Sequence, residues 1–362
     1  MATTSYGVNH PLAVKAWSRR LFHEIIGEQW LSKFIGEDSN SMIQIQGETN
    51  KGRGDRVRMG LRMLLTGAGQ IGDDTLEGNE EALVTFSDDV FVDQLRHATR
   101  SAGKMTEQRV HFSLREENRM ALRDWWAERL EVWTANQLAC NTAQTNTRFT
   151  GLQSPPTVDA THLVIAGGTG ATAETSISST TVIGTGQYFT LRDIDVCVAR
   201  AKTISPRIRP IRINGRDAYV MFLHPYQVYA LRNDTSATNS WVTLQQATLQ
   251  GRTEFADSPI VTGALGIYNQ TILHEWSYLP TAVSSSAVSV GLIRRAIFCG
   301  AQAGLMAYGQ ANGPNQMTWV EELFDFGNQL GVAAGMIAGL KATVFNAQLF
   351  GTIVVSSYAP TV

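Results

Sequence analysis

Residues 56–65 are apolar at every second position. The apolar positions are Val57, Met59, Leu61, Met63 and Leu65. The arginines of the segment lie between them, at Arg56, Arg58 and Arg62. Successive side chains of a β-strand point to opposite faces, so this period of two predicts a strand with one apolar and one basic face.

The charge reverses after this strand. Residues 67–72 contain three glycines, which permit a flexible turn. Residues 73–81 then hold five acidic side chains and no basic one. We predict a hairpin over 51–96, basic on one arm and acidic on the other, that lies across a neighbouring copy of the chain. The expected contact residues are Arg53, Arg56, Val57, Arg58, Met59, Leu61, Arg62, Asp73, Asp74, Glu77, Glu80 and Glu81.

A long helix is predicted from Phe112 to Cys140. Large apolar residues recur on one face at helical spacing, and neither Gly nor Pro interrupts about eight turns, or roughly 40 Å. Ser113 and Glu116 have the spacing of a capping box. We expect this helix to act as a spine against which a sheet packs. Its expected core residues are Leu122, Trp126, Leu130 and Trp133.

The flanking segments have weaker patterns. Residues 9–35 have apolar residues at roughly helical spacing and are predicted to be a helix. The polar segment 36–55 is predicted to form an arm that does not pack into a core. Residues 141–190 are rich in Thr, Ser and Gly, and are predicted to be a surface excursion with short strands near 162–166 and 180–183.

The remainder of the chain predicts a mixture of helices and strands, so the fold class is α+β. The expected helices are 191–202, with Thr190 as its cap, 227–232 and 241–250. The expected strands are 218–223, 266–268, 271–274, 295–298, 324–345 and 350–357. The glycines at 327, 331 and 335 favour a strand for 324–345, because Gly is a poor helix former.

Composition narrows the classes of function. A chain of 362 residues with 43% hydrophobic and 17% charged residues is a folded protein of one elaborate domain or two. Thirty basic residues against 32 acidic ones give a net charge of −2, so no global basic field attracts nucleic acid or a membrane. The N-terminus shows no secretory signal, and the apolar run 330–340 is too short to span a bilayer.

The three cysteines do not indicate a disulfide framework or a zinc site. Cys140, Cys197 and Cys299 lie far apart without a C-x-x-C pair. We interpret them as small buried hydrophobic residues in a reducing cytoplasm.

One motif resembles a dinucleotide fingerprint, Gly67-x-Gly69-x-x-Gly72. Asp73 and Asp74 follow directly, and their carboxylates would repel the phosphates that a helix N-terminus must receive in such a site. We therefore expect a flexible loop tip and no cofactor.

Candidate catalytic residues are few. His224, His274 and Glu275 follow or end apparent strands, but the sequence has no second histidine of a zincin helix, no G-x-S-x-G elbow and no P-loop. Structural histidines are the favoured interpretation, so we expect no metal site and no enzymatic activity. An intracellular α/β enzyme with a site near these three residues is kept as the alternative. A cytoplasmic binding module that grips a partner with residues 51–96 is a third possibility.

The order of the predicted elements resembles that of tailed-phage major capsid proteins with the HK-ninety-seven-type shell fold. The chain is most similar to the family typified by N-four-like short-tailed phages, over about residues 10–358. The segments that carry the resemblance are LRMLLTGAGQIGDDTLEGNEEAL, YVMFLHPYQVYALR, GALGIYNQTILHE, RRAIFCGAQAG and WVEELFDFGNQLGVAAGMIAGLKATVFNAQLFGTIVVSSYA.

The resemblance implies a division of the chain. It comprises an N-terminal arm (1–50), an extended E-loop hairpin (51–104), a P-domain (105–205) with the spine helix (112–142) and a surface insertion (141–190), an A-domain (206–328), and closing strands (329–362) that return to the P-domain.

The resemblance also implies partners. The chain would self-assemble into pentamers and hexamers of an icosahedral head, be located in the virion shell, and be assembled in the host cytoplasm. A separate scaffolding protein, a portal and packaged double-stranded DNA with few direct contacts are expected, a decoration protein stays open, and no membrane contact is expected. Some shells of this fold join a hairpin lysine to a neighbour's asparagine. Here Lys51 and Lys104 bracket the hairpin with no lysine between them, so no such crosslink is expected.

Overall fold

The computed structural model describes most of the chain. The described residues are 30–46, 55–63, 65–111, 113–166, 183, 186–213, 215–233, 264–280, 292–309 and 317–361. The predicted helix 9–35, apart from its last residues, the predicted helix 241–250, most of the predicted strand 180–183, and Arg53 lie outside them.

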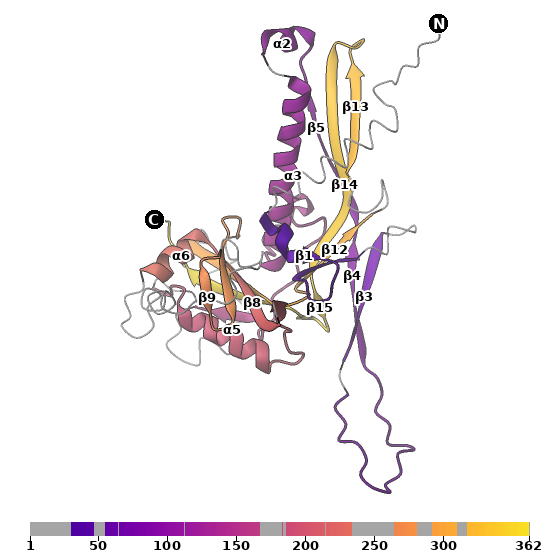
Figure 1. Ribbon diagram of the computed structural model, residues 1–362, viewed down its shortest axis with the longest axis vertical. Coiled ribbons are helices and arrows are strands. Elements are labelled where there is room, and N and C mark those ends of the chain that lie inside the picture. The colour runs from indigo at the N-terminus through magenta and orange to yellow at the C-terminus, as the bar shows by residue number, and fades with distance from the viewer. Residues whose placement is uncertain are drawn as a thin grey trace.

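The described part of the molecule has three regions (Figure 1). A long helix runs beside one sheet along the longest axis, and a narrow hairpin extends from this region to the far end of that axis. A second sheet with its own helices lies to one side. The hairpin is the part that projects furthest from the body of the protein.

The first sheet has six strands arranged around one long strand. Its order is β1-β2-β12-β14-β13, and β5 also pairs with β14. The bounds are β1 (Ile35–Gly36), β2 (Ile43–Gln46), β5 (Asp93–Arg100), β12 (Gly304–Tyr308), β13 (Thr318–Phe324) and β14 (Gln329–Ala342). Because β14 pairs with three strands, it sets the register of the sheet.

The long helix is α3 (Leu114–Leu138), which packs on β14 and β5. The four expected core residues, Leu122, Trp126, Leu130 and Trp133, are all buried. Ser113 is the N-cap, but its side chain makes no capping hydrogen bond, so the expected capping box does not form. Packing of the apolar face, rather than a cap, therefore holds this helix in place.

The second sheet has seven strands. Its order is β6-β17-β11-β8-β10-β9, and β7 also pairs with β8. The bounds are β6 (Leu163–Ile165), β7 (Ile211–Ile213), β8 (Arg216–Leu223), β9 (Gly266–Tyr268), β10 (Thr271–Glu275), β11 (Ile293–Cys299) and β17 (Thr352–Tyr358). The closing segment was expected to return to the layer of the spine helix. β14 lies in that layer, whereas β17 pairs with β11 and β6 in this second sheet.

Two helices accompany the second sheet, α5 (Leu191–Thr203) and α6 (Pro225–Arg232). Thr190 begins α5 as expected, and the side chain of Asp193 accepts a hydrogen bond from its backbone N–H at 2.8 Å. Ile194 and Val198 on this helix are buried in the second apolar cluster of the fold. The shorter elements are η1 (Trp30–Phe34), α2 (Lys104–Arg109), η3 (Thr147–Phe149), β15 (Val344–Phe345) and β16 (Gln348–Leu349).

The segment 36–55 does not behave as a free arm throughout. Met42 and Ile43 are buried, and β2 pairs in parallel with β12. The expectation that this segment stays out of a core is therefore wrong for residues 42–46. Its short alternation of isoleucine with glutamine lies within a polar stretch, so the strand is hard to recognise from composition.

A set of amide hydrogen bonds joins the spine helix, β14 and the hairpin. Gln137 of α3 is fully buried, and its Nε2 donates to the carbonyl of Gln153 at 3.0 Å. The side chain of Gln153 donates in turn to the carbonyl of Leu340 at 2.8 Å and accepts from the N–H of Phe91 at 3.4 Å. Buried polar groups are costly when unpaired, so this chain of contacts fixes how the three elements approach one another.

A buried arginine links the end of the spine helix to the second sheet. Arg295 of β11 donates from Nη1 to the carbonyls of Ala139 and Cys140, at 2.9 and 2.7 Å. These carbonyls follow the last turn of α3, where intrahelical donors are absent and a positive charge is favoured. The three cysteines are buried with free thiols, as expected for packing residues. No helix in the described residues is long and apolar enough to cross a membrane.

Replacement of Gly339 by alanine should destabilise the fold. A Cβ at this position of β14 would lie 2.0 Å from the carbonyl oxygen of Phe91, so backbone would have to move. We expect Gly339→Ala to lower the free energy of unfolding by about 1–3 kcal/mol, measured by denaturant titration of the unassembled chain. Gly60→Ala in the hairpin is the matched control, because a Cβ there meets nothing within 4 Å. Equal stability of the two variants would contradict this prediction.

Asp159 should make stability depend on acidic pH. Burial by itself would raise the pKa of this carboxyl, but hydrogen bonds from His162, Thr161 and the N–H of Leu349 hold it at about 2, against an ordinary 3.8. The stabilisation is therefore complete above about pH 4 and is lost as the pH falls towards 2.

We expect Asp159→Asn to be less stable than the parent chain by about 1–2 kcal/mol at pH 7, with the difference shrinking below about pH 4. Unfolding of both unassembled chains between pH 7 and pH 2 measures this. A difference that does not change with pH would show that the carboxylate charge is not the cause.

Candidate intersubunit surface

The projecting hairpin consists of two paired strands and a long loop. β3 (Arg56–Arg62) pairs antiparallel with β4 (Thr85–Phe91), so Arg58 stands opposite Asp89. Val57 is buried while Arg56 and Arg58 are exposed, which confirms the predicted alternation in this strand. The strand ends at Arg62, and Leu65 beyond it belongs to the loop.

The base of the hairpin is anchored on the first sheet. Val57 and Val90 are buried in a small apolar cluster with Leu305 and Ala307 of β12. Burial of such side chains stabilises the attachment by about 1.5–3 kcal/mol each. The hairpin is therefore held at one end only.

An acidic residue of β4 strengthens this anchor. Asp88 is buried, forms an ion pair with Lys341 of β14, and accepts a hydrogen bond from the N–H of Val344 at 3.0 Å. Asp88 therefore ties the returning strand to the end of β14 and to β15.

Two of the predicted contact arginines are engaged within their own hairpin. Arg58 forms a bidentate pair with Asp89, at 2.7 and 3.0 Å, and this arginine lowers the pKa of Asp89. The guanidinium of Arg56 lies 4.3 Å from the ring centroid of Phe91. The carboxylates opposite the basic strand are thus Asp88 and Asp89, which our sequence analysis missed. Their position in the next period-two segment, TFSDDVF, was the available signal.

The five acidic residues of 73–81 lie in the loop and not on the returning strand. The carboxylate of Glu81 accepts hydrogen bonds from the N–H groups of Thr66, at 2.7 Å, and Gly67, at 2.6 Å, which lower the pKa of Glu81. Glu80 accepts one from the N–H of Gly78 at 2.8 Å. Both are therefore used inside the loop, whereas Asp73, Asp74 and Glu77 are exposed to solvent.

The glycines of the fingerprint-like motif form turns in this loop. Gly69 and Gly72 have φ angles of +76° and +66°, a region that favours glycine. No helix follows Gly72 within residues 73–84, so the structure lacks the helix N-terminus that a dinucleotide site requires.

The loop exposes large apolar side chains, which the sequence analysis did not single out. Ile71 is 84% exposed and Leu76 is 61% exposed. Three more apolar residues of the loop are exposed: Leu65, Leu83 and Val84. A soluble chain rarely presents a contiguous apolar surface unless a partner covers it.

The opposite end of the long axis also exposes apolar side chains (Figure 1). Phe326 lies in the turn between β13 and β14 and is fully exposed, and Leu323 and Met105 nearby are exposed as well. The molecule therefore presents apolar residues at two separate ends.

His224, His274 and Glu275, on which the enzyme alternative depends, have separate surroundings. His224 caps α6, where its Nδ1 accepts a hydrogen bond from the N–H of Tyr226 at 3.2 Å, and burial lowers the pKa of His224 to about 4. His274 is fully buried with its ring 5.3 Å from that of Phe34, and Glu275 is exposed at the end of β10. The described residues contain no group of three His, Cys, Asp or Glu placed to hold a metal ion. The arrangement does not support an active site formed by these three residues.

Comparison with known proteins agrees with a shell-forming role. The sequence matches the family described as phage capsid protein over residues 4–361. It is 27% identical to the major capsid protein of Pseudomonas phage KPP25, with 93% of each chain covered.

Solved structures show the same fold. The capsid of Ralstonia phage GP4 superposes with a TM-score of 0.78, 29% identity and 99% coverage of both chains. The capsid of cyanophage Pam1 superposes with a TM-score of 0.71 at 19% identity, covering 92% of this chain and 93% of that one. The enzyme alternative has no support from these relatives. The chain belongs to the phage capsid protein family, as a major capsid protein with the HK-ninety-seven-type fold that forms the shell of the virion.

Proposed function

We propose that the hairpin of residues 51–96 is the arm by which each copy contacts its neighbour in pentamers and hexamers of the shell. The observation that supports this is the set of exposed apolar residues on its loop, with Ile71 and Leu76 foremost. The anchored base, at Val57 and Val90, would let the loop be presented at a constant angle to a second copy.

The charges of the hairpin would have two roles in this arrangement. Arg58 and Asp89 neutralise each other, so they would stiffen the two-stranded part rather than bind the neighbour. Asp73, Asp74 and Glu77 remain exposed and would meet basic groups of another copy. Surface ion pairs contribute about 0–1 kcal/mol each, so they would set the register of a contact that apolar burial stabilises.

Many such contacts would close the shell. Identical heterologous contacts generate rings when their rotation closes, and rings of five and six copies can tile an icosahedral surface. Each contact can be modest, because a copy that is held at several points dissociates only when all of them open. The two exposed apolar ends of the molecule are consistent with several contacts per copy.

We further propose the partners that the resemblance implies. The shell would enclose double-stranded DNA with few direct contacts, since the net charge of −2 provides no global basic field. A separate scaffolding protein would direct assembly, and a portal would occupy one vertex. The seven-stranded sheet would carry the A-domain role near the symmetry axes, and the six-stranded sheet with α3 the P-domain role.

Loss of the exposed apolar residues should prevent assembly. We expect Ile71→Ser with Leu76→Ser to abolish particles in electron micrographs and in sedimentation, because each side chain would otherwise contribute about 1.5–3 kcal/mol per contact. Both side chains are exposed in the single chain, so its thermal unfolding should not change. Gln70→Ser, an exposed polar position in the same loop, is the matched control and should assemble normally. Normal particles from the double variant would refute the arm.

The assembled shell should lack covalent links between copies. No lysine lies between Lys51 and Lys104, so the hairpin has no amine to join to a neighbour's asparagine. Denaturing electrophoresis of intact particles is expected to give one band at the mass of the chain, 39.6 kDa. A ladder of higher bands that survives a reducing agent would contradict this expectation.

A further inference from the structure

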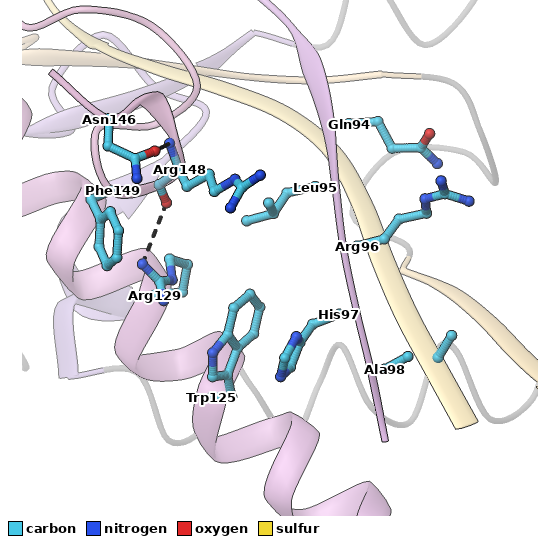
Figure 2. Close-up of a pocket in the computed structure, with 11 residues that line it drawn as sticks. Gln94, Leu95, Arg96, His97, Ala98, Trp125, Arg129, Asn146, Arg148 and Phe149 are labelled. Atoms are coloured by element: carbon cyan, nitrogen blue, oxygen red, sulfur yellow. Dashed lines mark hydrogen bonds between the residues drawn. The ribbon is translucent and has the colours of Figure 1, made fainter. Parts of the chain in front are cut away.

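A groove of about 800 Å³ lies between α3, β5 and the turn that follows α3 (Figure 2). Trp125 and Arg129 border it from the helix, and Arg148 and Phe149 from the turn. Figure 2 shows Leu95 and His97 pointing from β5 towards these residues, with Trp125 and His97 facing each other. The turn is held in place because Arg129 donates to the carbonyl of Arg148 at 3.5 Å and Asn146 accepts from its N–H at 3.1 Å.

The groove combines positive charge with aromatic surface. The guanidinium of Arg129 lies 4.8 Å from the ring centroid of Trp125 and 4.2 Å from that of Phe149. His97 is stacked on Trp125 at 4.3 Å. No carboxylate is among the residues that line the groove. An occupant that fits this lining carries negative charge beside apolar side chains.

The groove also reaches an unpaired strand edge. Five consecutive residues of β5, Gln94–Ala98, border it, so it extends around the strand rather than along one face. β5 pairs with β14 on one side, and among the described residues no strand pairs with its other side. An edge of this kind offers backbone N–H and C=O groups to an extended segment.

The hairpin loop has the complementary chemistry. Between residues 71 and 77 it exposes Ile71 and Leu76 together with Asp73, Asp74 and Glu77. Within one molecule the loop lies at the far end of the long axis, well away from α3 and β5, so it can reach this groove only on another copy (Figure 1).

We propose that the groove between α3 and β5 is the receptor for the acidic loop 71–77 of a second copy. The carboxylates of the loop face Arg129 and Arg148, and its apolar side chains pack on Trp125 and Phe149. The inference rests on the proposed role of the hairpin as an intersubunit arm, and it names the surface that the arm contacts.

Packaged DNA is a less suitable occupant. Duplex DNA would offer phosphates to the arginines, but its stacked bases would leave Trp125, Phe149 and Leu95 without apolar partners. The loop satisfies the charged and the apolar halves of the groove together, and both surfaces are present in one sequence.

Charge reversal tests the pairing. Arg148→Glu changes an exposed side chain of the groove, and Asp73→Lys with Asp74→Lys changes the loop. We expect each to lower the yield of particles by at least about tenfold, since opposed like charges are repelled in every copy of the contact. Combining the groove and loop changes should recover most of the yield. Arg207→Glu, an exposed arginine outside both surfaces, is the matched control and should assemble as the parent does.

The outcomes separate this proposal from the one on which it rests. If Ile71→Ser with Leu76→Ser blocks assembly but Arg148→Glu assembles normally, the arm stands and the groove is not its receptor. If the combined charge variant stays as defective as its parents, the pairing is refuted. If Arg148→Glu forms normal shells that hold less DNA than those of Arg207→Glu, the groove faces nucleic acid and the proposal is overturned. Thermal unfolding of each unassembled chain verifies that it is folded.

Discussion

The buried amide contacts of Gln137 and Gln153 determine how the long elements of this capsid protein are assembled. They connect the spine helix to the carbonyl of Leu340 on β14 and to the N–H of Phe91 at the end of the hairpin. An unpaired amide inside the protein costs free energy comparable to a lost hydrogen bond, so the three elements keep one relative position. Gly339, next to Leu340, leaves the space in which Phe91 approaches. The direction of the hairpin is thus decided in the core, some distance from the surface that it presents.

This anchoring divides the hairpin into a structural part and a contact part. In the paired strands the charges are satisfied locally, as in the bidentate pair of Arg58 and Asp89. In the loop the apolar side chains of Ile71 and Leu76 have no cover from their own chain. A shell protein benefits from this division, because the arm keeps its shape before assembly and contributes apolar burial only when a neighbour arrives.

The two sheets show why this fold is not a string of sequence domains. Strands from the beginning, middle and end of the chain alternate within the six-stranded sheet, where β2 lies beside β12 and β12 beside β14. The second sheet likewise joins β6 to β17. Non-local pairing of this kind makes each part depend on the others, and Arg295 connects the second sheet to the end of the spine helix.

Local periodicity was enough to predict the spine helix, the basic strand and most strands of the second sheet, because a stripe of apolar residues such as Trp126 and Trp133 depends only on the regular geometry of the element. It was also enough to exclude a dinucleotide site after Gly72. The tertiary structure alone decided which charges pair, since Asp89 meets Arg58 through strand register rather than through proximity in sequence. It likewise decided that β17 leaves the layer of the spine helix, and it brought the basic groove together from three separate segments, because contacts between distant parts of a chain leave no period in its sequence.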